Sequence, residues 1–298
     1  MCGAAWLSKH GAQRSETNEL LTLPSPAKLN LFLHITSRRG DGYHCLQTLF
    51  QLLDWGDELH FTPNSSGDVT VDMDTLEVPL RDNLIYKAAQ LLRSKPDTHY
   101  RGVHIEVRKR IPDGGGLGGG SSNAATTLVA LNKLWSAGLN TQQLQQLGLS
   151  LGADVPVFIG GHSAWAEGVG EQLQPIDLPQ RWYLVIDPGC RVPTKEIFCS
   201  RQLTRNSCPI TIAAFFKGGT RNDCQPVVQA LYPEVDNALK WLGNFGDAKL
   251  TGTGACIYAG WPEKATAEAV LREVPGHWSC WLTRGINVSP LISAMAEK

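Results

Sequence analysis

A run of glycines near the middle of the chain limits the possible folds and functions more than any other feature. Six of the seven residues from Gly114 to Gly120 are glycine. Glycine loses more backbone freedom on folding than any other residue, so such a cluster does not serve stability. Because glycine has no Cβ, a ligand can approach the main-chain N–H groups closely. The run therefore indicates a loop that binds a ligand through its backbone.

The segments on both sides of the glycines support this interpretation. Residues 104–111 before the loop are predicted to form a strand. After it, apolar residues recur at spacings of four, three and four, as on one face of a helix: Ala124, Leu128, Leu131 and Trp135. Ser121, Ser122 or Asn123 is expected to cap this helix. Free N–H groups and the positive end of a helix dipole would then converge on one spot, which suits a phosphate chain and disfavours a flexible linker.

Three familiar phosphate-binding patterns do not fit this loop. The P-loop requires a lysine before Ser121, and none is present. The dinucleotide pattern G-x-G-x-x-G is met formally by Gly114, Gly116 and Gly119, but it also needs an acidic residue about 20 positions on. Residues 134–140 contain no acid. The protein-kinase loop is excluded because no H-R-D or D-F-G follows.

Composition excludes several classes of partner. The chain has 298 residues, 42% of them hydrophobic, and a formal net charge of −1. This is typical of a globular protein with one large domain or two moderate ones. The near-neutral charge gives no basic surface for nucleic acid or an anionic membrane, and no apolar run approaches the ~20 residues that span a bilayer. We therefore expect neither a nucleic-acid nor a membrane partner.

The cysteines and the N-terminus indicate a cytoplasmic protein. Eight cysteines are scattered along the chain without a C-x-x-C pair, and no signal peptide is recognisable. They are therefore interpreted as reduced thiols, not as a disulfide framework or a zinc site. Residues 1–20 are polar and are predicted to be a loose extension.

A segment near the N-terminus is predicted to be a strand with two different faces. Between Pro26 and Ile35 the residues alternate, so that Leu29, Leu31, Leu33 and Ile35 would face the core. Lys28, Asn30, Phe32 and His34 would face the other side. A lysine and an asparagine side by side on that face fit either a functional site or a solvated surface, and the pattern alone leaves both open.

Further elements follow along the first half. Residues 46–53 and 58–62 are predicted to pair as antiparallel strands, and residues 69–73 to form a short strand. Helices are expected over 83–92 and over 141–149, the second capped by Thr141. Asp154 precedes Val155 and Pro156, so from the local pattern alone it is interpreted as the N-cap of another helix. Residues 163–174 are predicted to form a hairpin.

The second half is predicted to be a separate α+β unit, with a boundary between residues 160 and 161. Strands are expected over 182–187 and 277–283, and a glycine turn leads into a strand within 250–258. Helices are expected from Pro193, over most of 227–242, and over 265–274.

Three segments together resemble the motifs of the GHMP kinase superfamily. They are Pro26-Ala-Lys28-Leu-Asn30, the stretch from Pro112 to Asn123, and Leu250-Thr-Gly-Thr-Gly-Ala-Cys256. Further segments resemble one branch of this superfamily: Asp41-Gly-Tyr43-His44, Gly152-Ala-Asp154-Val-Pro156, Ala166-Glu-Gly-Val-Gly-Glu171 and Thr194-x-x-x-Phe198. The resemblance covers roughly residues 22–292. It implies phosphate binding by the glycine loop without a P-loop lysine.

The resemblance also implies a fold and a reaction. The expected fold is α+β with two domains: an N-terminal domain (1–160) like ribosomal protein S5 domain 2, and a ferredoxin-like C-terminal domain (161–298). ATP and substrate would meet in the cleft between them. The branch transfers the γ-phosphoryl group of ATP to the 2-hydroxyl of 4-diphosphocytidyl-2-C-methyl-D-erythritol, a step in non-mevalonate isoprenoid precursor biosynthesis.

Roles for individual residues follow from the same resemblance. Lys28 and Asp154 correspond to the catalytic pair, with Asp154 as general base. The expected ATP-binding residues are Pro112, Asp113, Gly114, Gly115, Gly116, Leu117, Gly118, Gly119, Gly120, Ser121 and Ser122. The expected substrate-binding residues are Asn30, Tyr43, His44, Thr194 and Phe198. Asp113 departs from the apolar residue expected there, and its charge should weaken ATP binding unless the side chain points away.

The expected recognition of the base rests on three of these residues. Tyr43 and Phe198 would stack on the cytosine ring, and His44 would hydrogen-bond to it. Without the resemblance, the sequence favours the interpretation of Tyr43 and Phe198 as partly buried core aromatics. Mg²⁺ is expected with ATP, but no paired carboxylates can be assigned as ligands. The rival functions are another kinase of the superfamily, such as a homoserine or mevalonate kinase, and a nucleotide sensor without activity. The sequence does not indicate an oligomeric state.

Overall fold

The computed structural model describes residues 20–73, 79–95 and 101–297. The extension predicted for residues 1–20 lies outside the described residues, apart from Leu20. None of the helices within these ranges is long and apolar enough to cross a membrane.

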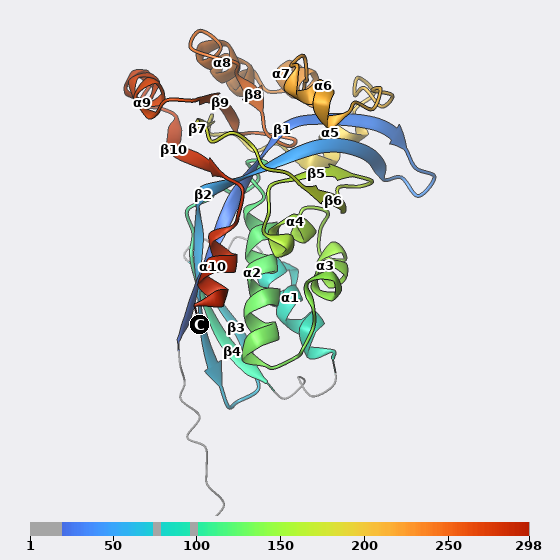
Figure 1. Ribbon diagram of the computed structural model, residues 1–298, viewed down its shortest axis with the longest axis vertical. Helices are drawn as coiled ribbons and strands as arrows, with labels where there is room; N and C mark the ends of the chain where they lie inside the picture. The colour runs from blue at the N-terminus through green and yellow to red at the C-terminus, as the bar shows by residue number, and fades with distance from the viewer. Residues whose placement is uncertain (1–19, 74–78, 96–100, 298) are drawn as a thin grey trace, which may run out of the picture.

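Two long antiparallel strands connect the two halves of the molecule (Figure 1). They are β1 (Leu21–Arg38) and β2 (His44–Asn64). In the first half, β4 (Gly102–Arg108) pairs antiparallel with β2, and β3 (Val69–Met73) pairs parallel with β4. Four helices pack on one side of these strands (Figure 1): α1 (Leu84–Arg93), α2 (Gly119–Leu134), α3 (Thr141–Leu149) and α4 (Val155–Gly160). A 3₁₀ turn, η1 (Leu80–Asp82), precedes α1.

The second half continues the same sheet. The strands run in the order β2–β10–β7–β9–β8, all antiparallel, and the hairpin of β5 and β6 pairs with β2. The strands are β5 (Ala164–Glu167), β6 (Gln172–Pro175), β7 (Trp182–Asp187), β8 (Lys249–Leu250), β9 (Ile257–Trp261) and β10 (Ser279–Ile286). The helices are α5 (Thr194–Cys199), α6 (Ile212–Phe216), α7 (Gln225–Leu231), α8 (Pro233–Leu242), α9 (Lys264–Glu273) and α10 (Pro290–Ala296).

The predicted strand pair at 46–62 is wrong, because this segment is one continuous strand within β2. The polar residues between the two predicted strands, Asp54 and Asp57, do not form a turn but accept hydrogen bonds from other parts of the chain. Asp54 accepts hydrogen bonds from Thr283 Oγ1 and the Arg284 N–H on β10. Gly56 lies opposite Pro26, where a Cβ would come within 2.6 Å of the Pro26 Cα. A glycine and two acids in a strand therefore mark close approach and cross-strand bonding here, not a turn.

Most other predicted elements are present, with local corrections. The 227–242 segment is two helices, because the chain leaves the helical conformation at Tyr232 before Pro233 begins α8. Asn140, not Thr141, caps α3, in a capping box with Gln143. The helix after the glycine loop begins at Gly119, and Gly118 with positive φ occupies its N-cap, so no side chain caps it.

Each half has its own hydrophobic core, and β1 contributes to both. Leu21 and Leu23 belong to the core beneath α1 and α2, whereas Leu33 and Ile35 belong to the core beneath α7 and α8. Helix α10, near the C-terminus, packs against the first core through Leu291. The boundary between residues 160 and 161 stays a prediction, since strands and helices from both sides of it share these cores.

The solvated-surface interpretation of β1 is wrong, because both faces of this strand are buried. Lys28 is 2% exposed, and Asn30 is 4% exposed. The pairing of β1 with β2 shifts register after Pro26, Asn30 and Ile35. Such irregularities redirect side chains, so strict alternation does not persist along the strand. A cation buried in this way requires specific partners.

A buried carboxylate on β2 fixes the entry to the glycine loop. Asp57 Oδ1 accepts hydrogen bonds from the N–H groups of Arg110 and Ile111, and Oδ2 accepts from Lys109 Nζ and Asn123 Nδ2. These bonds join the strand before the loop to the helix after it.

We therefore predict that Asp57→Ala destabilises the fold by ~3–5 kcal/mol, because it leaves Lys109 and two backbone donors buried without their acceptor. Chemical unfolding measures this loss. Asp54→Ala, which removes a more exposed acceptor on the same strand, should cost less; equal losses would contradict the special role of Asp57.

Candidate active site

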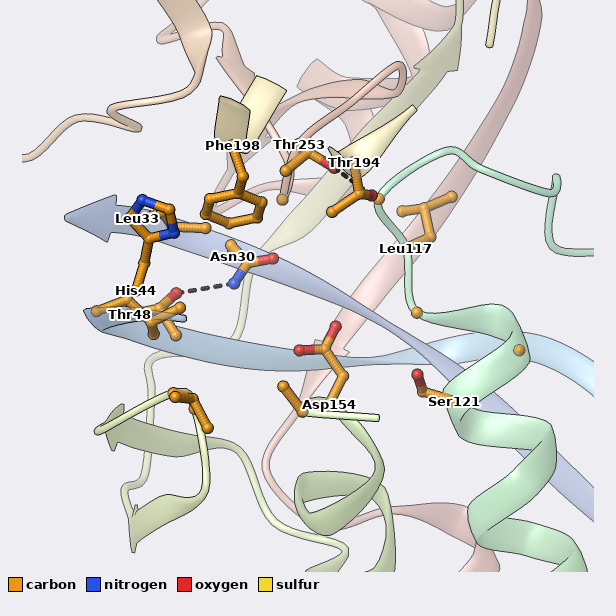
Figure 2. Close-up of a pocket in the computed structure, with 18 of the residues that line it drawn as sticks. Asn30, Leu33, His44, Thr48, Leu117, Ser121, Asp154, Thr194, Phe198 and Thr253 are labelled. Carbon is orange, nitrogen blue, oxygen red and sulfur yellow. Dashed lines mark hydrogen bonds between the residues drawn. The ribbon is translucent and has the colours of Figure 1, made fainter. Parts of the chain in front are cut away.

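The glycine loop, the catalytic residues expected from the sequence and both expected aromatic residues line one cavity of about 1080 Å³. Small-molecule sites usually have volumes of ~300–1000 Å³, so this cavity can hold two substrates. It is lined by β1, the β1–β2 turn, the glycine loop, residues 153–154 and the start of α5. Figure 2 shows side chains from these separate segments converging on it.

The backbone of the glycine loop has the geometry of an anion site. Gly114, Gly116 and Gly118 have φ values of 72°, 75° and 76°, whereas Gly115 and Leu117 between them do not have positive φ. Backbone that alternates in this way turns successive N–H groups to one side and forms a concavity for anions. The N-terminus of α2 follows at Gly119, and its first N–H groups have no partner within the helix. Both features favour phosphate binding.

The loop is held by hydrogen bonds to its carbonyl groups. The N–H groups of Ala255 and Cys256 donate to Gly114 and Gly115, and Thr251 Oγ1 donates to the Gly116 carbonyl at 3.2 Å. The Lys28 N–H donates to the Leu117 carbonyl. Since these donors occupy the carbonyl side of the loop, its N–H groups are left for a ligand. This explains why the sequence motif 250–256 accompanies the glycine loop.

Lys28 and Asp154 form an ion pair beside the loop. Lys28 Nζ lies 3.2 Å from Asp154 Oδ2, donates to Asn30 Oδ1 at 2.6 Å and donates to the Gly116 carbonyl at 2.9 Å. Asn30 Nδ2 in turn donates to Thr48 Oγ1, as the dashed line in Figure 2 shows. The ammonium group is thus fixed between the phosphate loop and the carboxylate.

Asp154 occupies the N-cap position of α4, but it does not act as a cap. Its side chain makes no capping hydrogen bond with that helix. The carboxylate points into the cavity instead (Figure 2), and its side chain is 31% exposed. The capping interpretation is therefore wrong, and Asp154 is available to a ligand while Lys28 holds it.

The charge of Asp113 is partly neutralised. Lys109 Nζ lies 3.4 Å from Asp113 Oδ1 and 2.9 Å from Asp57 Oδ2. The Asp113 side chain is also half exposed, at 51%. Both features weaken the repulsion that the sequence predicts between the Asp113 carboxylate and a bound phosphate.

The aromatic end of the cavity lies beyond Asn30. The imidazole of His44 stacks on the ring of Phe198, with centroids 5.1 Å apart and planes inclined by 28°. Tyr43 is 66% exposed, so the interpretation as a buried core aromatic is wrong for this residue. Phe198 is half-buried against the second core. Desolvation, followed by the nearby guanidinium groups of Arg205 and Arg38, lowers the pKa of His44, which favours the neutral ring.

Other residues expected in the site are placed differently. Thr194 lines the cavity, and its hydroxyl lies 2.9 Å from Thr253 Oγ1. Ser122 is not brought to the cavity: its hydroxyl accepts a hydrogen bond from Ser25, and its N–H donates to the Gly118 carbonyl. The sequence did not single out Thr48, Thr251, Thr253 or Arg205. For Thr251 and Thr253 the available signal was their position inside the third motif.

No group of three or more His, Cys, Asp or Glu side chains suited to a metal ion occurs in the described parts of the chain. Because Mg²⁺ commonly binds through one or two protein oxygens together with substrate phosphates, this arrangement is compatible with a metal that arrives with ATP.

Family models match both halves of the chain. The model "GHMP kinases N terminal domain" matches residues 83–162, and the model "GHMP kinases C terminal" matches residues 207–280. A 4-diphosphocytidyl-2-C-methyl-D-erythritol kinase of Hahella chejuensis is 51% identical over 290 residues, covering 94% of this chain and 98% of that protein. The enzyme of the same name from Pseudomonas paraeruginosa is 53% identical over 271 residues, covering 91% and 96%.

Solved structures agree with these matches. A crystal structure of 4-(cytidine 5'-diphospho)-2C-methyl-D-erythritol kinase superposes with a TM-score of 0.78 at 32% identity, covering 90% of this chain and all of that one. The mevalonate kinase of Methanococcus jannaschii shares the fold, with a TM-score of 0.66 at 15% identity over 92% of this chain. The α+β fold expected from the sequence motifs is thereby confirmed. The chain belongs to the GHMP kinase superfamily and, within it, to the family of 4-diphosphocytidyl-2-C-methyl-D-erythritol kinases.

Proposed function

We propose that this protein transfers the γ-phosphoryl group of ATP to the 2-hydroxyl of 4-diphosphocytidyl-2-C-methyl-D-erythritol, in non-mevalonate isoprenoid precursor biosynthesis. The observation that carries the proposal is the placing of the Lys28–Asp154 pair between a phosphate-binding loop and an aromatic end, within one cavity. Phosphoryl transfer depends chiefly on alignment and on neutralisation of charge, and this arrangement offers both.

Asp154 and Lys28 have complementary roles in the proposed reaction. The Asp154 carboxylate accepts the proton of the attacking hydroxyl as general base. Lys28 orients this carboxylate and stabilises negative charge on the attacking oxygen and the moving phosphoryl group. Since Nζ is 3.2 Å from Asp154 and 2.9 Å from the Gly116 carbonyl, one ammonium group lies beside both the proposed base and the phosphate loop. Asn30 contacts the substrate and positions Lys28 through its Oδ1.

ATP is bound by residues 112–121, with its phosphates against the N–H groups of the loop and of the first turn of α2. Mg²⁺, when bound with the nucleotide, would neutralise phosphate charge. It would be held mainly by phosphate oxygens, and the Ser121 hydroxyl, which lines the cavity at the helix N-terminus, is the candidate protein ligand. The proposal includes a cytoplasmic location, for which the free cysteines are the support.

The aromatic end binds the cytosine. A base that hydrogen-bonds in the plane of the His44 ring would lie roughly parallel to the Phe198 ring, because those two planes are inclined by only 28°. Tyr43 is exposed, lines the same cavity and directly precedes His44 in the chain, so we propose that it covers the other face of the base. Stacking of this kind tolerates any base, so selection of cytosine depends on hydrogen bonds.

The proposal is tested by measuring phosphoryl transfer from ATP to three acceptors in parallel: the cytidylyl substrate, mevalonate and homoserine. Activity with the first alone is expected. Preferred activity with mevalonate or homoserine would assign the chain another reaction of its superfamily, and ATP binding without transfer would indicate a nucleotide sensor.

We predict that Phe198→Ala raises the KM for the cytidylyl substrate roughly 5- to 150-fold, which corresponds to the ~1–3 kcal/mol of one stacking face. The maximal rate should fall less, because the base lies away from the reacting hydroxyl and is bound equally in the ground and transition states. The KM for ATP should not change. Steady-state kinetics in both substrates measure these effects.

A matched variant separates stacking from packing at this position. Phe198 also packs against the second core, so its truncation has a stability cost that thermal melts will record. Phe198→Leu keeps most of the apolar volume but loses the aromatic face, and it should raise KM with a smaller change in melting temperature. A large drop in melting temperature with an unchanged KM would remove Phe198 from the site.

A further inference from the structure

Arg205 is hydrogen-bonded to two residues of the aromatic end, His44 and Phe198, but does not itself line the cavity. Its Nη2 donates to the carbonyl groups of Phe198 and Ser200, and its Nη1 donates to the Leu203 carbonyl. Its Nε–H donates to His44 Nε2 at 3.1 Å. Arg205 is not among the residues that line the cavity. A half-buried guanidinium with four directed bonds has a fixed position, so it can act on the ring of His44.

The hydrogen bond from Arg205 determines where the proton of His44 lies. A guanidinium is always protonated in proteins and has only donors. His44 Nε2 must therefore be an acceptor without a proton, and a neutral imidazole then carries its proton on Nδ1. The lowered pKa of His44 is consistent with the neutral form. His44 Nδ1 has no hydrogen-bond partner within the described ranges of the chain, and Figure 2 shows a ring nitrogen turned into the cavity.

We propose that Arg205 is a positioning residue that holds His44 as a donor at Nδ1, and so makes the aromatic end select cytosine over uracil. This inference rests on the proposed function, since it concerns the base of the cytidylyl substrate. It assigns to Arg205 a role in specificity that acts through His44 and requires no contact with the substrate.

The chemistry of the two bases gives the proposal its direction. Proteins read unpaired bases by hydrogen bonds to their Watson–Crick edges. Cytosine has an acceptor at N3, whereas uracil has an N3–H donor in the same place. A fixed donor at His44 Nδ1 pairs with cytosine N3 and meets a second donor in uracil. Sites built around a required hydrogen bond discriminate strongly, because the wrong partner leaves polar groups unpaired.

Arg205 also connects the two walls that the base must fit between. It donates to the Phe198 carbonyl at 2.9 Å and to the Ser200 carbonyl at 2.7 Å, at the end of α5, while it holds His44 on β2. The imidazole and the Phe198 ring are thereby kept stacked at their present inclination. A fixed tautomer selects one base only when the ring is also held in one orientation. Arg205 determines both the tautomer and the orientation of the His44 ring.

The first test measures the tautomer directly in the protein without substrate. Two-bond ¹H–¹⁵N correlation spectra of ¹⁵N-histidine-labelled protein distinguish a proton on Nδ1 from one on Nε2, and His44→Gln identifies the His44 signals among the eight histidines. The proton is expected on Nδ1 in the wild type. In Arg205→Met, a population with the proton on Nε2 is expected. A wild-type His44 protonated on Nε2, or on both nitrogens, would overturn the proposal.

The second test compares kcat/KM for the cytidylyl substrate and for its uridylyl analogue. In Arg205→Met, His44 can move its proton to Nε2 and accept from uracil N3–H, so the preference for cytidine should fall roughly 5- to 150-fold, which is the effect of one buried unpaired group. The KM for ATP should not change. Arg201→Met, at an exposed arginine of the same segment, is the matched control and should keep the preference.

A purely structural role for Arg205 predicts a different pattern. Both substrates would then lose kcat/KM by the same factor, and the preference for cytidine would persist, which would overturn the proposal. A double-mutant cycle adds a second criterion: in a His44→Gln background, Arg205→Met should not change the preference further. If the wild type does not phosphorylate the cytidylyl substrate, the proposed function fails, and the spectra still decide whether Arg205 sets the tautomer.

Discussion

Asp154→Asn is expected to lower kcat for the cytidylyl substrate by about 10²- to 10⁴-fold, the usual contribution of a general base, while ATP affinity stays nearly unchanged. The substitution keeps the shape of the side chain but removes its ability to accept the hydroxyl proton. Asp154 lies outside the glycine loop and at the N-cap of α4, so the N–H groups that face the phosphates are not altered. Single-turnover rates and titration with ATP measure the two quantities separately.

The charge of Lys28 requires a control for this variant. Asp154 is the ion-pair partner of a lysine that is 2% exposed, so its replacement by asparagine also alters the electrostatics of the cavity. Lys28 keeps its bonds to Asn30 Oδ1 and to the Gly116 carbonyl, which should preserve the fold, and a thermal melt will verify this.

Asp113→Asn provides the contrasting case. This variant removes a carboxylate from the same cavity, but one that pairs with Lys109, whereas Asp154 pairs with Lys28. It should affect ATP affinity, in the direction of tighter binding, more than it affects kcat. Near-normal turnover by folded Asp154→Asn would make the assignment of the base wrong. A fall in kcat of equal size in both variants would point to general electrostatics and not to proton transfer.

The parts of the site that were predictable from sequence are those whose chemistry is local. The glycine loop, the strand before it and the helix after it are adjacent in the chain, so glycine content and helical periodicity were sufficient to place them. The structure adds that Gly118 itself occupies the N-cap of α2. Serine and asparagine were expected there because they commonly cap helices, but a left-handed glycine joins the loop to the helix instead.

The residues that were missed act across long separations in sequence. Thr251 reaches the Gly116 carbonyl from 135 positions away, and Arg205 reaches His44 from 161 positions away. No periodicity carries such information, because it depends on how β1 and β2 bring the two halves together. The mistaken turn within β2 has a similar origin: Asp54 and Asp57 have partners on β10 and around the glycine loop that are distant in the chain.

The two faces of β1 show how burial changes the interpretation of a pattern. Alternation correctly placed Lys28 and Asn30 side by side, but it could not distinguish a solvated face from a second buried one. In the structure, β2, the glycine loop and the third motif cover that face. Asn30, for example, is hydrogen-bonded to Lys28, Thr48 and Thr251. Because burial of polar groups without partners is unfavourable, polar residues enclosed in this way indicate a site and not a solvated surface.

Gly118→Val is expected to abolish measurable ATP binding and, with it, turnover. Gly118 has a φ of 76°, and a Cβ there would lie 2.9 Å from Phe158 Cζ and 3.1 Å from Lys28 Cε. A β-branched residue is strained in this conformation by ~1–3 kcal/mol before any contact is counted. Relief of the strain would rotate the peptide groups that form the anion site, and relief of the contacts would displace Lys28 from Asp154.

Gly120→Ala is the matched control for this prediction, because it changes a glycine two positions further on that lies within α2. A Cβ at Gly120 would meet only Leu84 Cδ1, at the ordinary contact distance of 3.5 Å, and the position does not have positive φ. Alanine is favoured over glycine inside a helix by ~0.5–1 kcal/mol, so this variant should be slightly more stable and should still bind ATP. Calorimetric titration with ATP, beside thermal melts of both variants, compares them. Unchanged ATP affinity in folded Gly118→Val would place the phosphates elsewhere, whereas equal loss in both variants would show that any side chain in this segment obstructs the nucleotide.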